Sequence, residues 1–391
     1  MCFFKSRALL RMNFFNKKRI IVFLSTCLLV LILLLQINSN WRLLDTMRGP
    51  PDSEPLVYQC CISMNNSIRT NIFFLKTHKT GGTTVQNVIV RFAIKNSLDM
   101  MNTKYDTYYL PISDSSIYPE LMTPNNKYNV FAKHARYDSN LKSYQYPDTS
   151  MVTILRHPVT LFQSLYIFFR MDKTTGMNFQ QFLKAPVKPA FLTGFDSEIA
   201  YRGYNQMSVD LGFDLAQSKN TTAVTEFIEK IDREFDFVMI TEHMDESFVL
   251  LANLMGWPLE YVTSLRLNSR LEESEPYSLT SQDESTIIDL NQVDAQLYDY
   301  FLKKFHKCRQ QYGENNLNQQ VQQLQIMNRN FKERCVAREV TRWNKGFVKR
   351  IEYVPRNLFD MECFYSMQES PDLAKITRQV QANRLKALRN E

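Results

Sequence analysis

Short apolar runs alternate with amphipathic stretches along the chain from about residue 71 onward. Apolar runs of strand length occupy residues 72–75, 128–132, 151–155 and 235–240, and helical patterns follow at 84–95, 159–170, 222–234 and 245–255. This alternation predicts an α/β domain with a central parallel sheet flanked by helices, because parallel strands need helical crossovers. Such sheets bind ligands beyond the carboxyl ends of their strands, so we expect the functional site there.

Two long helical patterns lie closer to the C-terminus. Residues 289–311 carry an apolar face, and residues 315–340 are rich in Gln and Asn but keep apolar residues at helical spacing. The second stripe is compatible with a partner-binding helix or a short coiled coil, although a stripe of this kind more often packs on its own domain. We expect both segments to belong to the same domain as the sheet.

An apolar run near the N-terminus has the length of a membrane span. Residues 20–37 are interrupted only by Ser25, Thr26 and Gln36. At about 1.5 Å per residue the run spans roughly 27 Å. Six basic residues and no acidic residue precede it, and no good small-x-small cleavage site follows it. The basic flank predicts a type II signal anchor, with residues 1–19 cytosolic and the chain lumenal from Asn38 onward.

Residues 38–70 contain several prolines and no sustained hydrophobic period, which is typical of a stem. The predicted organisation is a cytosolic tail (1–19), a transmembrane anchor (20–37), a lumenal stem (38–70) and one globular domain (71–391). Glycosylation sequons at Asn65 and Asn220 are consistent with a lumenal location. Five cysteines follow the anchor, where an oxidising compartment would allow disulfides, and their pairing stays open.

The net charge of +7 is concentrated in the N-terminal tail. Without the six basic residues before position 20, the chain holds 41 Lys and Arg against 40 Asp and Glu. A nucleic-acid-binding domain should keep its basic excess on the folded part. The balanced charge therefore argues against nucleic acid as a partner and against a strongly polyanionic acceptor.

Residues 71–84 have the composition of an anion-binding loop. An apolar strand runs into a polar turn with two glycines, and a helix is predicted to follow. Backbone N–H groups in such a turn converge beside the positive end of the helix dipole, where they can hold a phosphate or sulfate. The turn lacks the Gly-Lys-[Ser/Thr] ending of a Walker A loop, which argues against a P-loop kinase. The candidate anion-binding residues are Lys76, Lys79, Thr80, Gly81, Gly82, Thr83 and Thr84.

Several segments of the chain are similar to one known family. Residues 74–80 read Phe-Leu-Lys-Thr-His-Lys-Thr, residues 151–158 read Met-Val-Thr-Ile-Leu-Arg-His-Pro, and shorter matches lie at 210–212, 242–251 and 267–270. Together they resemble the galactose 3-O-sulfotransferase family, of the galactosylceramide sulfotransferase type, which uses the sulfate donor PAPS (3′-phosphoadenylyl sulfate). The resemblance runs from about residue 71 to residue 308. The turn Gly-Gly-Thr-Thr at 81–84 departs from the family's more frequent Ala-Ser-Ser-Thr, which leaves the subfamily open.

The resemblance implies a P-loop-like sulfotransferase fold and a set of donor-binding residues. In such enzymes an Arg and a Ser eight residues later hold the 3′-phosphate, which correspond here to Arg156 and Ser164. Arg270 is a further candidate phosphate contact. Lys79 matches the loop lysine that faces the leaving group, and Lys76 is a candidate brace for the phosphosulfate. The reaction needs no metal, and none is expected.

The reaction also needs a base for the acceptor hydroxyl, which favours histidine because its pKa lies near neutrality. His134 follows a predicted strand directly, as the base histidine of related enzymes does, and we predict that it is the base. His78, inside the anion loop, is the alternative and could orient the donor or acceptor instead. Arg136 and Asn205 are candidate sugar contacts from their positions alone.

The expected function is transfer of sulfate from PAPS to the 3-hydroxyl of a β-galactoside, on a glycolipid such as galactosylceramide or on a glycan. The resemblance implies a single-pass type II protein of the Golgi membrane, and a homodimer is compatible with the sequence. The alternatives are a uronyl 2-O-sulfotransferase acting on glycosaminoglycans and a non-catalytic, membrane-anchored glycan-binding relative. The balanced charge disfavours the first, and the presence of Lys79, His134, Arg156 and Ser164 disfavours the second.

Overall fold

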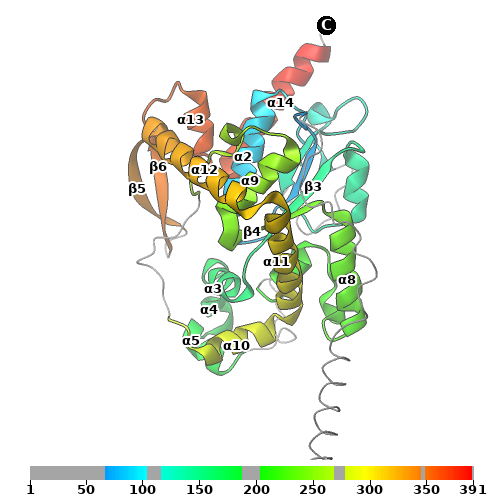
Figure 1. Ribbon diagram of the computed structural model, residues 1–391, viewed down its shortest axis with the longest axis vertical. Helices are drawn as coiled ribbons and strands as arrows, with labels where there is room; N and C mark the ends of the chain where they lie inside the picture. The colour runs from blue at the N-terminus through cyan, green and yellow to red at the C-terminus, as the bar shows by residue number, and fades with distance from the viewer. Residues whose placement is uncertain (1–66, 104–115, 187–202, 268–277, 345–347, 390–391) are drawn as a thin grey trace, which may run out of the picture. The chain divides into compact units, whose positions relative to one another are not determined.

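The computed structural model describes residues 67–103, 116–186, 203–267, 278–344 and 348–389 (Figure 1). The chain divides by its internal contacts into two units, Met1–Gln59 and Cys60–Glu391, and all described residues belong to the second. The predicted anchor at 20–37, most of the predicted stem and Asn65 lie outside the described residues. None of the helices in the described ranges combines the length and apolar character that a membrane span requires.

A four-stranded parallel sheet forms the centre of the second unit. Its strands are β1 (Ile72–Leu75), β2 (Val130–Lys133), β3 (Ser150–Leu155) and β4 (Phe237–Ile240), in the order β2-β1-β3-β4. Ile72 of β1 lies opposite Val130 of β2 and Ser150 of β3. The four predicted strands are thereby confirmed, with ends that differ by at most two residues.

Helices cover this sheet, which explains why its strands read as continuous apolar runs. β1, β3 and β4 are buried along their whole length, and Phe73 stacks on Phe131 of the neighbouring strand with ring centroids 4.5 Å apart. Helix α2 (Gly82–Lys95) contacts β2, and helices α9 (Met244–Met255) and α11 (Gln292–Tyr312) contact β4. The predicted α/β fold with a flanked parallel sheet is confirmed.

The remaining helices extend the unit around these layers. They are α3 (Pro158–Phe168), α4 (Met171–Thr175), α5 (Phe179–Lys184), α7 (Gln206–Asp210), α8 (Thr221–Glu234), α10 (Ser281–Leu290), α12 (Glu314–Cys335), α13 (Met361–Ser366) and α14 (Ser370–Arg389). Short 3-10 turns lie at Pro119–Leu121, Ser139–Tyr144, Leu215–Gln217, Thr241–His243 and Leu259–Val262. Figure 1 shows α12 running beside α9 and α14 beside α2, in agreement with their contacts.

Both long C-terminal helical patterns need correction. The segment 289–311 is broken at Asn291 into α10 and α11. The segment 315–340 stays helical only to Cys335, where α12 ends, and residues beyond it form β5 (Val336–Asn344), which pairs antiparallel with β6 (Val348–Pro355). The buried apolar residues of α12 at helical spacing end at Phe331 and Cys335. The residues that follow do not continue this spacing, so the pattern no longer favours a helix. As expected, α12 packs on its own domain, against α9.

Candidate active site

The predicted site residues come from segments that follow neighbouring strands. β1 leads into residues 76–81, β2 into His134, β3 into Arg156 and β4 into Thr241. Because the strands are parallel, these segments leave the sheet at the same edge. The Thr241 hydroxyl lies within donating distance of the carbonyls of Thr80 and Leu155, at 2.6 and 2.9 Å, and so connects three of the segments.

Helix α2 begins with an uncapped N-terminus at the end of the loop. Gly81 is its N-cap residue, with a left-handed φ of 77°, and no side chain caps the helix. The first turn contains no acidic residue. The first N–H groups of a helix have no acceptor within the helix, and the dipole makes this end positive. The start of α2 therefore has the geometry and charge to hold a phosphate or sulfate group.

The loop hydroxyls differ in their surroundings. Thr80 is fully buried, and its hydroxyl lies 2.8 Å from that of Thr77. The Thr84 hydroxyl accepts from the backbone N–H of Leu267 at 3.2 Å. Thr83 is buried in the first turn of α2. Thr80 and Thr84 therefore stabilise the loop and its surroundings, and in this conformation the backbone of the helix start is the main feature suited to an anion.

Lys79 and Arg156 join the loop to α3. The Arg156 guanidinium donates from Nη1 to the Lys79 carbonyl at 3.0 Å and from Nε to the Thr160 hydroxyl at 3.0 Å. The Lys79 ammonium lies 4.3 Å from the centre of the Phe168 ring. Lys79 itself has a left-handed φ of 59°. The structure thus brings together the anion loop and the Arg156 segment, which the sequence placed in one site.

Lys76 is buried behind the loop, with 5% of its surface exposed. Its ammonium donates to Oε1 of Gln86 at 3.1 Å and to the hydroxyl of Ser370 at 2.5 Å. Its aliphatic part lies against Gly82, where an added Cβ would come within 2.8 Å of the Lys76 Cγ. Lys76 therefore links the loop to α2 and to the start of α14.

His134 is held by the backbone of the same loop. Its Nδ1 lies 2.7 Å from the Lys76 carbonyl oxygen, and because a carbonyl can only accept, Nδ1 carries the hydrogen. In the neutral ring this leaves the lone pair on Nε2. Burial, followed by electrostatic repulsion from His78 and Lys76, holds the pKa of His134 well below its ordinary value. The ring is therefore neutral at physiological pH, with its lone pair on Nε2.

His78 stacks on His134 and is fixed by a carboxylate. The two ring centroids are 4.2 Å apart with an interplanar angle of 21°. Nδ1 of His78 lies 3.1 Å from both oxygens of Asp210, and the backbone N–H of His78 donates to the same carboxylate at 2.6 Å. Asp210 is fully buried and also accepts from Gln206 at 2.8 Å. The carboxylate sets both the position and the tautomer of His78.

Asp210 is a functional candidate that the sequence reasoning missed. The only signal was the similarity of residues 210–212 to the family, which assigned no role to the carboxylate. Asp210 ends helix α7, whose start is fixed by Asp294, because that buried carboxylate accepts from the N–H groups of Met207 and Ser208 at 3.1 and 2.8 Å. Asn205, a predicted sugar contact, precedes α7, and its Oδ1 accepts from two backbone N–H groups at the start of α11.

The other predicted residues are more dispersed. Ser164 is buried on α3, about two turns after Arg156. Arg136 is exposed and donates to the Phe213 carbonyl at 3.1 Å. Asn220 is exposed at the N-cap of α8. Arg270 lies outside the described residues.

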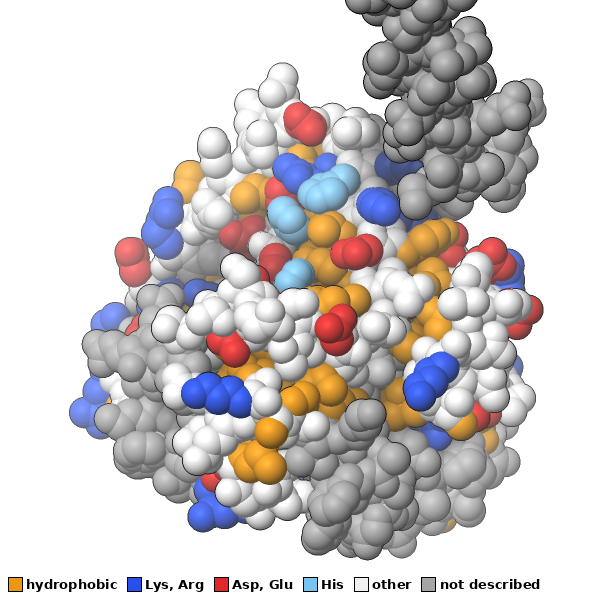
Figure 2. All heavy atoms as spheres, turned by 90° about the horizontal axis from the view of Figure 1, so that it is seen from below, with side chains coloured by type: hydrophobic (Ala, Val, Ile, Leu, Met, Phe, Trp, Pro, Cys, Tyr) orange, Lys and Arg blue, Asp and Glu red, His pale blue; other side chains and the backbone are white. Residues whose placement is uncertain are grey.

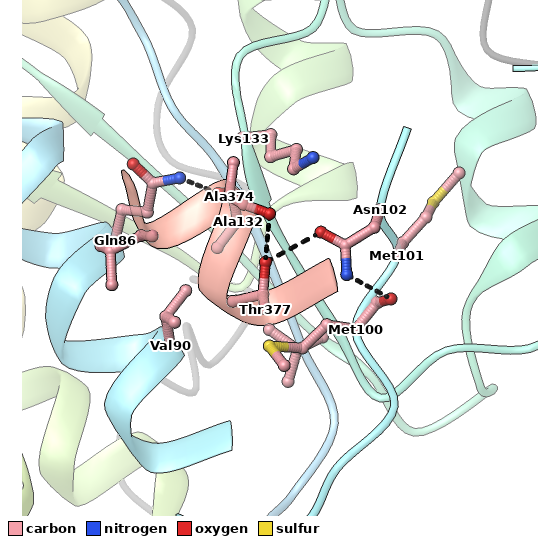
Figure 3. Close-up of a pocket in the computed structure, with 11 residues that line it drawn as sticks. Gln86, Val90, Met100, Met101, Asn102, Ala132, Lys133, Ala374 and Thr377 are labelled. Carbon is pink, nitrogen blue, oxygen red and sulfur yellow. Dashed lines mark hydrogen bonds between the residues drawn. The ribbon is translucent and has the colours of Figure 1, made fainter. Parts of the chain in front are cut away.

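No metal-binding cluster of three or more His, Cys, Asp or Glu side chains occurs within the described ranges. A small cavity of about 20 Å³ lies between α2, β2 and α14, beside residues 100–102 (Figure 3). It has room for about one water molecule and is too small for a nucleotide. The uncapped start of α2 and the loop before it remain the candidate donor site.

Comparison with known proteins places these features in a family. The model of the galactose-3-O-sulfotransferase family matches residues 7–355. Mouse (Mus musculus) galactose-3-O-sulfotransferase 3 is 30% identical over 281 residues, which cover 68% of this chain and 64% of that protein. Human (Homo sapiens) galactosylceramide sulfotransferase is 29% identical over 302 residues, covering 74% and 70%. Human galactose-3-O-sulfotransferase 2 is 31% identical over 278 residues, covering 68% of each. The chain thus spans slightly less than two thirds of the first of these relatives.

Proposed function

Because this chain belongs to the galactose-3-O-sulfotransferase family, we propose that it transfers sulfate from PAPS to the 3-hydroxyl of a β-galactosyl residue. The observation that carries the proposal is the pair of stacked imidazoles, 4.2 Å apart, at the loop that leads into the uncapped start of α2. The uncapped start of α2 suits an anionic donor. The imidazoles supply a proton acceptor for the hydroxyl of the acceptor sugar.

The donor fits the residues at the loop and on α3. The N–H groups at the start of α2 would hold the 5′-phosphosulfate. Arg156 would hold the 3′-phosphate with Ser164, because a guanidinium matches a phosphate in a two-pronged arrangement. When bound, PAPS supplies the sulfuryl group that is transferred.

Lys79 is the candidate cation at the departing oxygen. Its ammonium now lies over the Phe168 ring, a contact worth about 0.5–1 kcal/mol at a partly exposed site. A charge-assisted hydrogen bond to a phosphate oxygen is stronger. Lys79 would therefore exchange the ring for the donor when the donor binds, and it would stabilise the negative charge that develops on the leaving group.

His134 acts as the base in this proposal. The Lys76 carbonyl holds its Nδ1–H, so Nε2 accepts the proton of the acceptor hydroxyl as that oxygen attacks the sulfur. Its lowered pKa keeps the ring unprotonated beforehand. We assign to His78 the orientation of the reacting groups, because the Asp210 carboxylate fixes its ring beside His134.

A membrane-anchored, Golgi-lumenal location is part of the same proposal. Two observations support it. Cys335 and Cys363 form a disulfide, which is typical of an oxidising compartment. Asn220, within a glycosylation sequon, is exposed as a glycan attachment site must be. Glycosidase treatment of the full-length chain from a secretory-pathway host should increase its gel mobility, and Asn220→Gln should reduce that change.

The acceptor is proposed to be a neutral galactoside. On the face drawn in Figure 2, acidic and basic side chains of the described residues are interspersed, and those residues form no continuous basic field there. A polyanionic glycosaminoglycan would be attracted by such a field. Galactosylceramide and neutral galactose-terminated glycans need no such attraction, since they bind through hydrogen bonds and ring stacking.

The test is a transfer assay on the full-length chain in detergent, with radiolabelled PAPS. The acceptors are galactosylceramide, lactose, N-acetyllactosamine and a desulfated glycosaminoglycan, and the site of the label is determined by linkage analysis. We expect label on the galactose 3-oxygen of at least one galactoside. Label on the glycosaminoglycan alone would reject the proposal. The proposal would also be rejected if the protein binds no adenosine 3′,5′-bisphosphate and transfers no sulfate to any of the four acceptors.

A further inference from the structure

Helix α14, which lies beyond the family-matched residues, reaches the loop of the candidate active site. The family match ends at residue 355, and α14 begins at Ser370. The Ser370 hydroxyl donates to Oε1 of Gln86 at 2.6 Å and accepts from the Lys76 ammonium at 2.5 Å. Lys76 precedes it by 294 positions. Ser370 therefore bridges the anion loop and helix α2 from the far end of the chain.

Lys76, Gln86 and Ser370 form a compact polar cluster in a largely buried place. Nε2 of Gln86 donates to the Ala132 carbonyl at 2.7 Å, as Figure 3 shows, so its Oε1 is presented to the other two residues. A buried ammonium is costly unless hydrogen-bond acceptors surround it. Because Lys76 is only 5% exposed, these two acceptors contribute directly to holding its ammonium in place.

The charge around this cluster also comes from the C-terminal segment. A helix N-terminus disfavours a nearby cation, yet the Lys76 ammonium contacts the first residue of α14. The preceding residue, Glu369, offsets this effect with a carboxylate that is held by Arg350 of β6 at 2.7 Å. Burial raises the pKa of Glu369, and the positive charges of Arg350 and Lys76 oppose that rise. The hairpin and α14 thus both contribute to the environment of the loop lysine.

Helix α14 is attached to the domain along the residues that follow Ser370. Oε1 of Gln381 accepts from the Met100 N–H at 2.7 Å, and Nε2 of Gln381 donates to the Leu121 carbonyl at 2.9 Å. Leu373 is buried against the main core. Figure 3 shows Ala374 and Thr377 of α14 among the residues that line the small cavity. The helix therefore presents Ser370 to the loop in a fixed position.

We propose that Ser370 is a positioning residue of the active site: its hydroxyl fixes the Lys76 side chain, and through Lys76 it fixes the loop carbonyl that orients His134. The link from Lys76 to His134 is the 2.7 Å contact between the Lys76 carbonyl and Nδ1 of the ring. The inference rests on the proposed sulfotransferase function. It adds to the site a segment that lies beyond the family-matched residues.

The test compares three variants of the full-length chain in the labelled-PAPS assay. Ser370→Ala removes the hydroxyl, Ser370→Thr keeps it, and Ser139→Ala is the control, because the Ser139 hydroxyl donates to Glu234 at 3.0 Å outside the site. We expect kcat/KM to fall about tenfold in Ser370→Ala, as for the loss of one hydrogen bond to a charged group. We expect kcat/KM to be close to the wild-type value in Ser370→Thr and equal to it in Ser139→Ala.

A pH profile separates positioning from a general loss of structure. His78, Lys76 and Lys79 all act electrostatically on His134. Lys76 lowers the pKa of His134. If Ser370→Ala lets the Lys76 ammonium move away, the pKa of His134 rises and the acidic limb of kcat/KM should shift to higher pH. A loosened fold would only lower kcat/KM at every pH. Thermal unfolding of each variant is measured alongside.

Two results would overturn the inference while the wild type remains active. One is wild-type kcat/KM in Ser370→Ala. The other is an equal loss in Ser370→Ala and Ser370→Thr, with lower unfolding midpoints and an unmoved acidic limb. A wild-type chain that neither binds adenosine 3′,5′-bisphosphate nor transfers sulfate would instead reject the proposed function, and the inference with it.

Discussion

At the scale of single residues, the proposed chemistry depends on which nitrogen of each imidazole carries a hydrogen. The Lys76 carbonyl fixes this for His134, and the Asp210 carboxylate fixes it for His78. Both partners act on Nδ1, so the neutral ring of His134 has its lone pair on Nε2. Neither arrangement is visible in sequence, because the His78–Asp210 contact joins positions 132 residues apart and the His134–Lys76 contact joins positions 58 residues apart.

The first prediction concerns pH. Because the pKa of His134 is lowered by burial and by neighbouring charges, the base stays unprotonated until the pH falls well below its ordinary value of about 6.5. We expect the acidic limb of kcat/KM to lie below pH 6.5. The free protein should also lose stability as the pH falls below 6.5, because the unfolded chain then binds a proton that the folded ring does not. An acidic limb above pH 7 would contradict the assignment of His134 as base.

The second prediction concerns Asp210. Asp210→Asn replaces a carboxylate by an amide that can donate to Nδ1, so His78 can adopt the other tautomer. We expect kcat to fall by about 10²-fold, the loss typical of misplaced reacting groups, with little change in the Kd for adenosine 3′,5′-bisphosphate. The control is Asp214→Asn, at an exposed 3-10 cap four residues later, which should match the wild type. An unchanged kcat in Asp210→Asn would show that the orientation of His78 by Asp210 has no part in the mechanism.

At the scale of elements, the start of α2 is the feature on which donor binding depends. Gly81 has a left-handed φ of 77°, and an added Cβ would lie 2.8 Å from the Met244 Cε. We expect Gly81→Ala to cost about 1–2 kcal/mol of folding free energy from the backbone conformation and to weaken bisphosphate binding severalfold. Calorimetry and thermal unfolding measure the two effects.

Gly176→Ala is the matched control for this change. Gly176 has a similar φ of 69°, but nothing lies within 4 Å of an added Cβ. It should lower stability by a similar amount and leave bisphosphate affinity unchanged. Equal loss of affinity in both variants would show that binding responds to stability, and not to the geometry of the helix start.

The elements of the sheet could be predicted from sequence, whereas short or distant elements could not. β1 lies at the predicted residues 72–75, because a fully buried strand reads as an uninterrupted apolar run. Helix α7 has five residues, too few for a periodic signal, so Asp210 lacked a structural context. The β5–β6 hairpin was not predicted, because the apolar spacing of α12 was taken to continue to residue 340. In the structure the helix ends at Cys335 and β5 begins at Val336.

At the scale of the whole molecule, the candidate site is assembled from segments distributed along most of the described chain. Residues 76–82, His134 and Arg156 are brought together by parallel topology, which the alternating pattern predicts, whereas Asp210 reaches the site from the short helix α7. Ser370 was not predictable, because side-chain contact across 294 positions depends on how α14 packs against α2. The family-matched part of the chain and the C-terminal helix therefore contribute to the same site.

The measurement that tests the account most directly is a single-turnover assay of the full-length chain with labelled PAPS and a galactoside acceptor. It compares the wild type with His134→Ala, and bisphosphate binding is measured on both. The account predicts that label reaches the galactose 3-oxygen in the wild type. In His134→Ala the rate should fall by about 10²–10⁴-fold, the usual contribution of a general base, while bisphosphate binding is retained. Transfer by His134→Ala at the wild-type rate would contradict the assignment of His134 as the base.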